Sequence, residues 1–237
     1  RAIAEVLGAL DGKIAANRHL SQVIDDLASS LFQKRFKHAP SAPLTSIAKV
    51  NTTSISPQSE GEFRYLDISL VGNGTSESPT LTTWAEAPSR ARRGVPAGST
   101  IWSTVRPNRR SHCLILDEDP ILVASTGFAV LTPSECGPAF LYETTKQKSF
   151  QDYLESVAEG SAYPAVRSSE FAKASVTSAT KEERNAFEEE AGPLRALQAS
   201  LERENQVLAS TRDELLPLLM SGRITVGAAS SRVEEVV

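Results

Sequence analysis

Two stretches of seven-residue apolar spacing, one toward each end of the chain, most constrain how this protein can fold. That spacing puts a narrow apolar seam on a helix, and such a seam is normally buried against a second helix. Each stretch of about 35 residues makes a helix of roughly 52 Å at 1.5 Å per residue. Because the first helix enters the intervening segment and the second leaves it, we expect the two to lie antiparallel. The seam residues are Ile3, Leu10, Ile24 and Leu31, and Phe187, Leu194, Leu201, Leu208 and Leu215.

The segment between the two helices carries short strand-like runs separated by glycine, proline and asparagine turns. We expect strands over 63–70, 100–105, 112–116, 121–124 and 128–131, and a short amphipathic helix over 150–157. The predicted fold class is α+β, with a mixed α/β domain flanked by two long helices forming an antiparallel coiled coil. The predicted boundaries are 1–38 for the first helix, 39–178 for the domain, 179–222 for the distal helix and 223–237 for a flexible tail.

The bulk composition is that of a soluble protein, with 40% hydrophobic and 23% charged residues. No apolar stretch approaches the ~20 residues that a membrane span requires. The chain starts at Arg1 inside a helical pattern, so we expect a trimmed chain or a fragment of a longer one. Its two cysteines, Cys113 and Cys136, are predicted to be idle thiols in a reducing cytoplasm.

Residues with catalytic or metal-binding chemistry are scattered. The histidines, His19, His38 and His112, are too dispersed for a metal cluster. His112 adjoins Cys113, but neighbours on a strand point to opposite faces, which disfavours a catalytic pair. No nucleophile elbow and no glycine-rich cofactor loop is present. We therefore expect a non-catalytic chain without metal or cofactor.

Positive charge is concentrated in one part of the middle domain, although the net charge is −4. The stretch 87–116 holds six arginines and no acidic residue, whereas the chain from Lys181 onward has eleven acids against seven bases. Such a basic stretch favours contact with nucleic acid, and a solvated loop is the alternative. The candidate DNA-binding residues are Arg90, Arg92, Arg93, Arg106, Arg109 and Arg110.

Several runs, in order, resemble the DNA-specificity subunit of type I restriction–modification systems. Residues 1–14 resemble the central conserved helix of that family, although Gly12 stands where a second acid is common. Further runs of this chain resemble other parts of the family's subunits: the end of that helix, an early strand and the turns of the recognition domain, and the distal helix. These runs are 31–36, 65–69, Arg92-Arg93 with the Gly98 turn and 103–108, 125–130, 160–164 and 208–222.

The resemblance implies a cytoplasmic, non-catalytic subunit that reads part of a split duplex DNA target. Residues 39–178 would be a target-recognition domain, and the flanking helices would act as spacers that dock methyltransferase and restriction subunits. Such subunits typically have two recognition domains, whereas this chain has one. It is therefore expected to be the C-terminal half of a longer subunit, or a half-subunit that pairs as a homodimer.

Two alternatives remain open at the level of sequence. Instead of a specificity subunit, the chain could be a coiled-coil assembly scaffold whose middle domain binds protein, or the specificity segment of a single-chain restriction–methylation enzyme. The run 103–108 is favoured as scaffold over DNA contact, because it is similar across the family. Tyr163 and Phe128 are favoured as core residues over base-stacking ones.

Overall fold

The computed structural model describes residues 2–234, which divide into two compact units. Among the described residues, the helical unit combines 2–29 with 193–234, and the sheet module comprises Ser30–Gly192. Arg1 and residues 235–237, which the sequence assigned to the first helix and the tail, lie outside the described residues. Among the described helices, none is both long enough and apolar enough to span a membrane.

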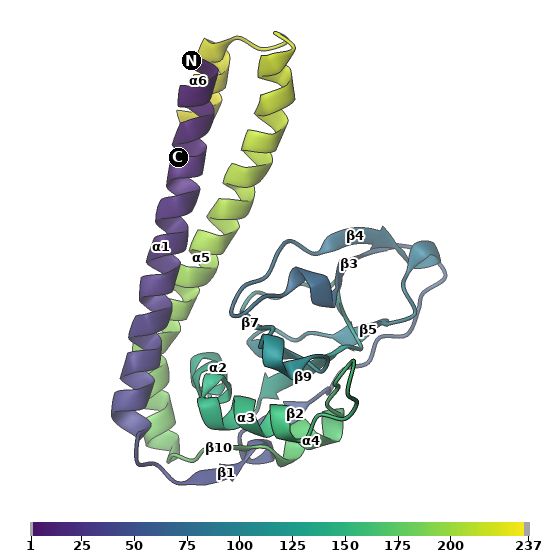
Figure 1. Ribbon diagram of the computed structural model, residues 1–237, viewed down its shortest axis with the longest axis vertical. Helices are drawn as coiled ribbons and strands as arrows, with labels where there is room; N and C mark the ends of the chain where they lie inside the picture. Colours follow the sequence, from purple (N-terminus) through teal and green to yellow (C-terminus); the bar gives the residue numbers. More distant parts are fainter. Residues whose placement is uncertain (1, 235–237) are drawn as a thin grey trace. The chain divides into compact units, whose positions relative to one another are not determined.

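The helical unit is built on the two long helices that the apolar spacing predicts. Helix α1 is Ala2–Phe36 and helix α5 is Lys181–Met220. Their seam residues meet in antiparallel order, so the predicted antiparallel pair is confirmed (Figure 1). Leu194 is only half-buried, and Leu201 is buried. The apolar seam consists of Val6, Leu10 and Ile14 on α1 and Leu208, Leu215 and Leu219 on α5.

A third helix, α6 (Val226–Glu234), extends this seam. Helix α5 stops at Gly222, whose φ of 68° suits glycine. The Arg223 N–H donates to the Leu218 carbonyl at 2.9 Å, which closes a Schellman-type end. The sequence predicted a flexible tail after this point, and for 226–234 that expectation is wrong. Ala229 and Val233 are buried against the first turns of α1, which removes their apolar surface from water.

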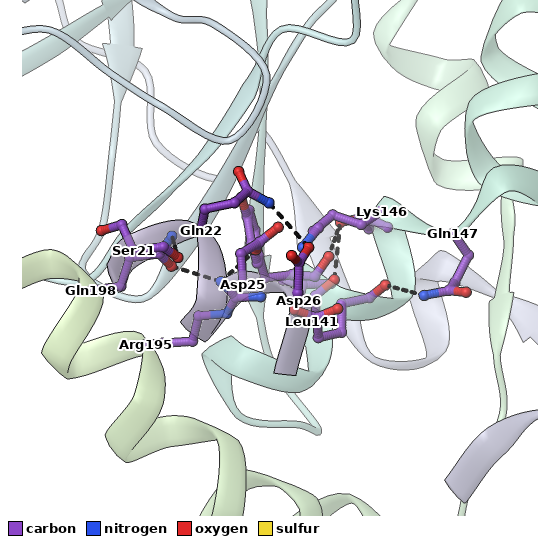
Figure 2. A network of polar contacts seen from close by, with 12 residues as sticks. Ser21, Gln22, Asp25, Asp26, Leu141, Lys146, Gln147, Arg195 and Gln198 are labelled. Atoms are coloured by element: carbon purple, nitrogen blue, oxygen red, sulfur yellow. Dashed lines mark hydrogen bonds and ion pairs between the residues drawn. The ribbon is translucent and has the colours of Figure 1, made fainter. Parts of the chain in front are cut away.

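The middle of the helix pair is polar where the seven-residue apolar spacing is interrupted. Asn17, which is buried, donates from its amide to Glu204 at 2.9 Å and to Asn205 at 3.1 Å. Farther along, the guanidinium of Arg195 contacts the Asp25 carboxylate at 2.7 Å (Figure 2). These contacts replace apolar burial with matched polar pairs, which fix register at some cost in stability.

The sheet module contains two four-stranded sheets and a two-stranded one. The first runs in the order β2 (Ala48–Val50), β9 (Phe128–Pro133), β6 (Ser99–Ser103) and β7 (His112–Ile115). The second runs in the order β4 (Thr80–Thr83), β3 (Glu62–Leu66), β8 (Leu122–Ser125) and β5 (Ala91–Gly94). The short pair is β1 (Ser41–Pro43) with β10 (Ser175–Thr177). Only β3 and β8 are parallel among these strand pairs.

Three short helices cover part of the first sheet and complete its core (Figure 1). They are α2 (Pro138–Lys146), α3 (Lys148–Ser156) and α4 (Ser168–Lys173). The expected helix over 150–157 corresponds to α3, while α2 and α4 were not anticipated. The expected strand over 63–70 ends early at Leu66. The Asp67 carboxylate accepts from the Ser69 N–H at 3.0 Å and starts a 3₁₀ turn, Ile68–Leu70, instead.

The ends of both long helices are anchored within the sheet module by aromatic packing. Phe32 and Phe36 of α1 contact Phe140 of α2 and Phe187 of α5, with ring centroids 5.3–5.8 Å apart. Glu188 of α5 accepts from the first N–H groups of α2 at 3.1 Å. The module thus holds both helix ends through one core.

Candidate nucleic-acid interface

The turn 104–110 holds the second half of the basic stretch in a strained backbone. Arg106 and Arg110 bracket the 3₁₀ turn Pro107–Arg109, and both have left-handed backbones, with φ of 50° and 54°. For a residue with a side chain this conformation costs about 1–2 kcal/mol. Backbone strain of this kind concentrates at functional sites, where the surrounding structure holds it.

Buried side chains of the same turn provide that support. The Ser103 hydroxyl donates to the Val105 carbonyl at 2.9 Å, and the Thr104 hydroxyl donates to the Gly127 carbonyl at 2.9 Å. Pro107 is buried as well. The run 103–108 therefore has a scaffold role in Ser103, Thr104 and Pro107, as favoured from the sequence. Arg106 and Asn108 retain partly or fully exposed side chains.

Backbone hydrogen bonds join this turn to two other turns, and we call the three together the turn cluster. It comprises residues 104–110, 125–127 and 160–164. The Thr104 N–H donates to Gly127 at 2.8 Å, and the Arg106 N–H donates to Pro164 at 2.7 Å. Arg90 joins from outside, since its carbonyl accepts from the Thr126 N–H at 2.8 Å. Turns from separate parts of the sheet module thus lie together, with Arg90 beside them.

The early strand of the module also reaches this cluster. Burial raises the pKa of the Tyr65 hydroxyl, while the Ser125 hydroxyl and the charge of Arg90 act in the opposite direction. Burial also acts to raise the pKa of Asp67, but hydrogen bonds from Ser69 and Tyr65 outweigh it, so the pKa lies below its ordinary value. The run 65–69 is therefore adjacent to the 125–127 turn, with its carboxylate already satisfied.

Four of the six candidate arginines belong to this surface, and none has an acidic partner. Arg90 and Arg109 are exposed, while Arg106 and Arg110 are half-buried. Within residues 2–234, none of the four forms an ion pair with a carboxylate. By contrast, Arg64 of β3 pairs with Asp119 at 2.8 Å. The cluster therefore presents positive charge that the protein itself does not neutralise.

The other two candidates, Arg92 and Arg93, have a more structural environment on strand β5. Both are half-buried, and the Arg93 backbone bridges Ser54 of a neighbouring segment. The Arg92 guanidinium donates to the Ala91 carbonyl at 2.6 Å. The Arg93 Nε is buried and has no hydrogen-bond partner in the described chain. The structure thus joins Arg90 to the turn arginines through the 125–127 turn and places Arg92 and Arg93 on strand β5.

Tyr163 is a residue of this surface that the sequence misassigned. We expected it in the core, but its side chain is 54% exposed, so that expectation is wrong. Phe128 was also expected in the core, and it is fully buried. The difference is local: Phe128 begins a strand, whereas Tyr163 lies in a loop between Gly160 and Pro164 where no periodic pattern applies. The loop context was the signal that could have identified it.

His112, Cys113 and Cys136 are packed against neighbouring side chains within the sheet module. His112 stacks on Trp102 with ring centroids 4.3 Å apart, while Cys113 packs into a separate apolar cluster, so the two neighbours point to different sides. Burial, together with the nearby Glu188, raises the pKa of the Cys136 thiol to about 12. That thiol stays protonated at neutral pH. In residues 2–234, no three His, Cys, Asp or Glu side chains are grouped to hold a metal.

Comparison with known proteins places the fold. No protein-family model matches the chain, and no curated protein matches it. Among solved structures, the chain resembles the HsdS subunit from Thermoanaerobacter tengcongensis, with a TM-score of 0.55, 24% identity and 75% of this chain covered. A structure that describes complex assembly and conformational transition of the type I R-M system matches with a TM-score of 0.54 and 24% identity over 78% of this chain. The type I restriction-modification S subunit from M. genitalium matches with a TM-score of 0.53 and 18% identity over 90% of this chain.

These likenesses show that the chain shares its fold with such subunits. The matched part is 47%, 48% and 56% of those chains, so this chain spans about half of their length.

Proposed function

We propose that this chain is the DNA-specificity subunit of a type I restriction–modification system, or one half of such a subunit. It reads one half of a bipartite duplex target and docks methyltransferase subunits and, through the assembled complex, the restriction subunit. The shared fold supports this proposal, and so does the length ratio, because this chain with its one sheet module matches about half of each solved chain. Its place of action would be the cytoplasm, together with the DNA.

The observation that carries DNA binding is the unneutralised charge of the turn cluster. Arg90, Arg106, Arg109 and Arg110 have no carboxylate partner among the described residues. Arginine contacts phosphates without reading sequence, and it also bonds bidentately to guanine edges in the major groove. Because the 104–110 turn and the adjacent Arg90 present these side chains, changes in turn sequence would change the target while the scaffold stays the same.

Selection from a pool of randomised duplexes tests this function. We expect the chain to enrich a short sequence and to bind it more weakly as salt rises. The double variant Arg109→Gln/Arg110→Gln should flatten the log K versus log salt slope by about 0.9 for each lost phosphate contact. A base-reading member would instead relax one target position at a cost of ~1–3 kcal/mol.

Arg64→Gln is the matched control, because Arg64 is similarly exposed but paired with Asp119. Equal binding of every duplex, with an unchanged slope in the double variant, would favour the protein-binding scaffold instead. The same result would locate any DNA-contacting face away from the turn cluster.

Docking of a protein partner is supported by apolar side chains on the outer face of the helical unit. Leu20, Val23 and Leu27 of α1 are 43%, 48% and 47% exposed, and their spacing places them along one side of the helix. We expect Leu27→Asp to reduce co-purification with a co-expressed type I methyltransferase subunit. Leu81→Asp, at a 57% exposed position on β4, is the control. Equal recovery from both variants would contradict docking at this face.

A half-subunit would require a second copy of the chain. Closed homodimers use the same surface on both copies, so a two-fold pair would read a palindromic split target. A mapped target with two unlike halves, together with a monomer in light scattering, would instead indicate half of a two-module subunit.

We also expect the purified chain to transfer no methyl group and to cleave no DNA by itself. Incubation of the chain with a labelled methyl donor and duplex DNA tests this. Label transfer without a partner would favour a segment of a single-chain enzyme.

A further inference from the structure

Tyr163 differs in exposure from every other aromatic side chain of the chain. The sequence holds eight Phe, four Tyr and two Trp, and all of them lie within residues 2–234. Every Phe and both Trp are buried, Tyr65 and Tyr142 are buried, and Tyr153 is half-buried. Tyr163 alone is exposed, at 54% of its surface. Tyrosine is enriched at binding surfaces, because its ring is apolar and its hydroxyl is polar.

The backbone holds this ring in place. Glu159 and Ala165 exchange two hydrogen bonds of 2.9 Å, which close the loop 160–164 at its base. Gly160 has a φ of 96°, and a side chain there would approach the Tyr163 carbonyl at 3.2 Å. The Arg106 N–H holds the other side of the loop through Pro164 at 2.7 Å. The ring is therefore presented from a closed loop bonded to the neighbouring turn, which lowers the entropy lost on binding.

The electrostatic surroundings of the ring suit an electron-rich, negatively charged polymer. The Arg106 guanidinium lies over the Tyr163 ring, 4.6 Å from its centroid, as in a cation–π contact. The nearest loop carboxylate, Glu159, is paired with Arg167 at 2.8 Å. Arg106 and the neighbouring Arg109 and Arg110 therefore leave this loop with a net positive environment.

We propose that Tyr163 stacks on a nucleobase at a base step that opens when the turn cluster binds its duplex, with Arg106 positioning the ring; this deepens the proposed function and rests on it. Aromatic rings and arginine planes stack on unstacked bases, and the contact tolerates any sequence because every base has a π face. Phosphate contact would need only the arginines. The exposed ring adds a contact that charge alone does not supply.

The test uses the full chain and a duplex isolated by selection from a randomised pool. Tyr163→Ala should lose roughly 5- to 150-fold in affinity, the range found for one base–aromatic stack, without changing the salt slope. Tyr163→Phe should keep affinity within about two-fold, because it preserves the ring. With iodouracil substituted for thymine along the duplex, illumination should cross-link the peptide that contains Tyr163. Leu81→Ala is the control, since Leu81 is equally exposed but aliphatic.

Two failures are distinguishable. If the wild-type chain binds no duplex selectively, the DNA-binding function itself fails, and the stacking role with it. If the wild-type chain binds and Tyr163→Ala binds equally well, or the cross-link maps elsewhere, only the stacking role is overturned. Loss of binding to a protein partner in Tyr163→Ala, with DNA affinity intact, would likewise overturn it and assign the ring to a protein contact.

Discussion

The seam of the helical unit and the turn cluster of the sheet module treat their arginines in opposite ways. In the helical unit, Arg195 has a side chain only 1% exposed and is paired with Asp25 and hydrogen-bonded to Gln198 at 2.6 Å. In the sheet module, Arg90 and Arg109 are exposed and have no acidic partner within the described residues. Charge that is matched inside a seam determines how two helices align. Charge that is left unmatched at a surface remains available to a ligand.

The largest expected effect distinguishes the seam from the outside of the same helix. Leu208 is fully buried against α1, whereas the adjacent Val207 is 53% exposed. Leu208→Asp should lower the free energy of unfolding by at least about 3 kcal/mol, because it buries an unpaired charge and removes apolar contact. Val207→Asp should change it by less than about 0.5 kcal/mol. Urea denaturation measures both, and equal midpoints would show that α1 and α5 do not pack through this seam.

The second prediction concerns the polar layer, which is the set of buried polar contacts between α1 and α5 that includes the Arg195–Asp25 pair. Asp25→Ala removes the carboxylate that contacts the buried Arg195 at 2.7 Å and should destabilise the chain by about 2–4 kcal/mol. The double variant Asp25→Leu/Arg195→Leu should recover most of that loss, because an apolar pair needs no compensating charge. Thermal unfolding of the two variants compares them. A double variant as unstable as the single one would mean that the layer supplies stability rather than alignment.

The third prediction concerns pH. Burial raises the pKa of Glu202 in α5 from 4.5 to about 7, although Arg195 and Arg203 act to lower it. The folded chain therefore holds this proton more tightly than the unfolded chain. The contribution of Glu202 to the free energy of unfolding should be highest below pH 4.5. It should fall between pH 4.5 and 7 and level off above pH 7. The change should amount to about 1–3 kcal/mol. Glu202→Gln should flatten this dependence in denaturation at several pH values; an unchanged profile would assign it to other groups.

The smallest effects on stability are expected within the basic stretch. Substitutions there should distinguish the arginine of the turn cluster, Arg109, from the strand arginine, Arg93. Arg109→Met should leave the unfolding free energy within about 0.5 kcal/mol. It should nevertheless flatten the salt dependence of DNA binding by about 0.9. Arg93→Met removes a buried Nε that has no hydrogen-bond partner in the described chain, so it should be neutral or slightly stabilising and should leave the salt slope unchanged. A flattened slope in Arg93→Met would instead add strand β5 to the DNA-binding surface.

The helices were predictable because their signal is local. Residues seven apart on one helix face the same partner, so Leu201, Leu208 and Leu215 could be identified as buried without knowledge of the rest of the chain. The end of α5 was equally local, since Gly222 adopts the left-handed backbone that stops a helix. Helix α6 was missed because its short apolar pattern becomes favourable only when α1 and α5 have already formed a surface for it.

In the candidate site, too, some features follow from the local sequence and others depend on the tertiary structure. The sequence alone determined that six arginines without an acidic neighbour lie in one stretch, and the resemblance identified the runs around them. Only the tertiary structure decided that Arg90 and the 104–110 turn share a surface with Tyr163, while Arg92 and Arg93 lie half-buried in a strand. The physical reason is that hydrogen bonds between turns depend on strand pairing across tens of residues, and residue spacing along the chain contains no record of that pairing.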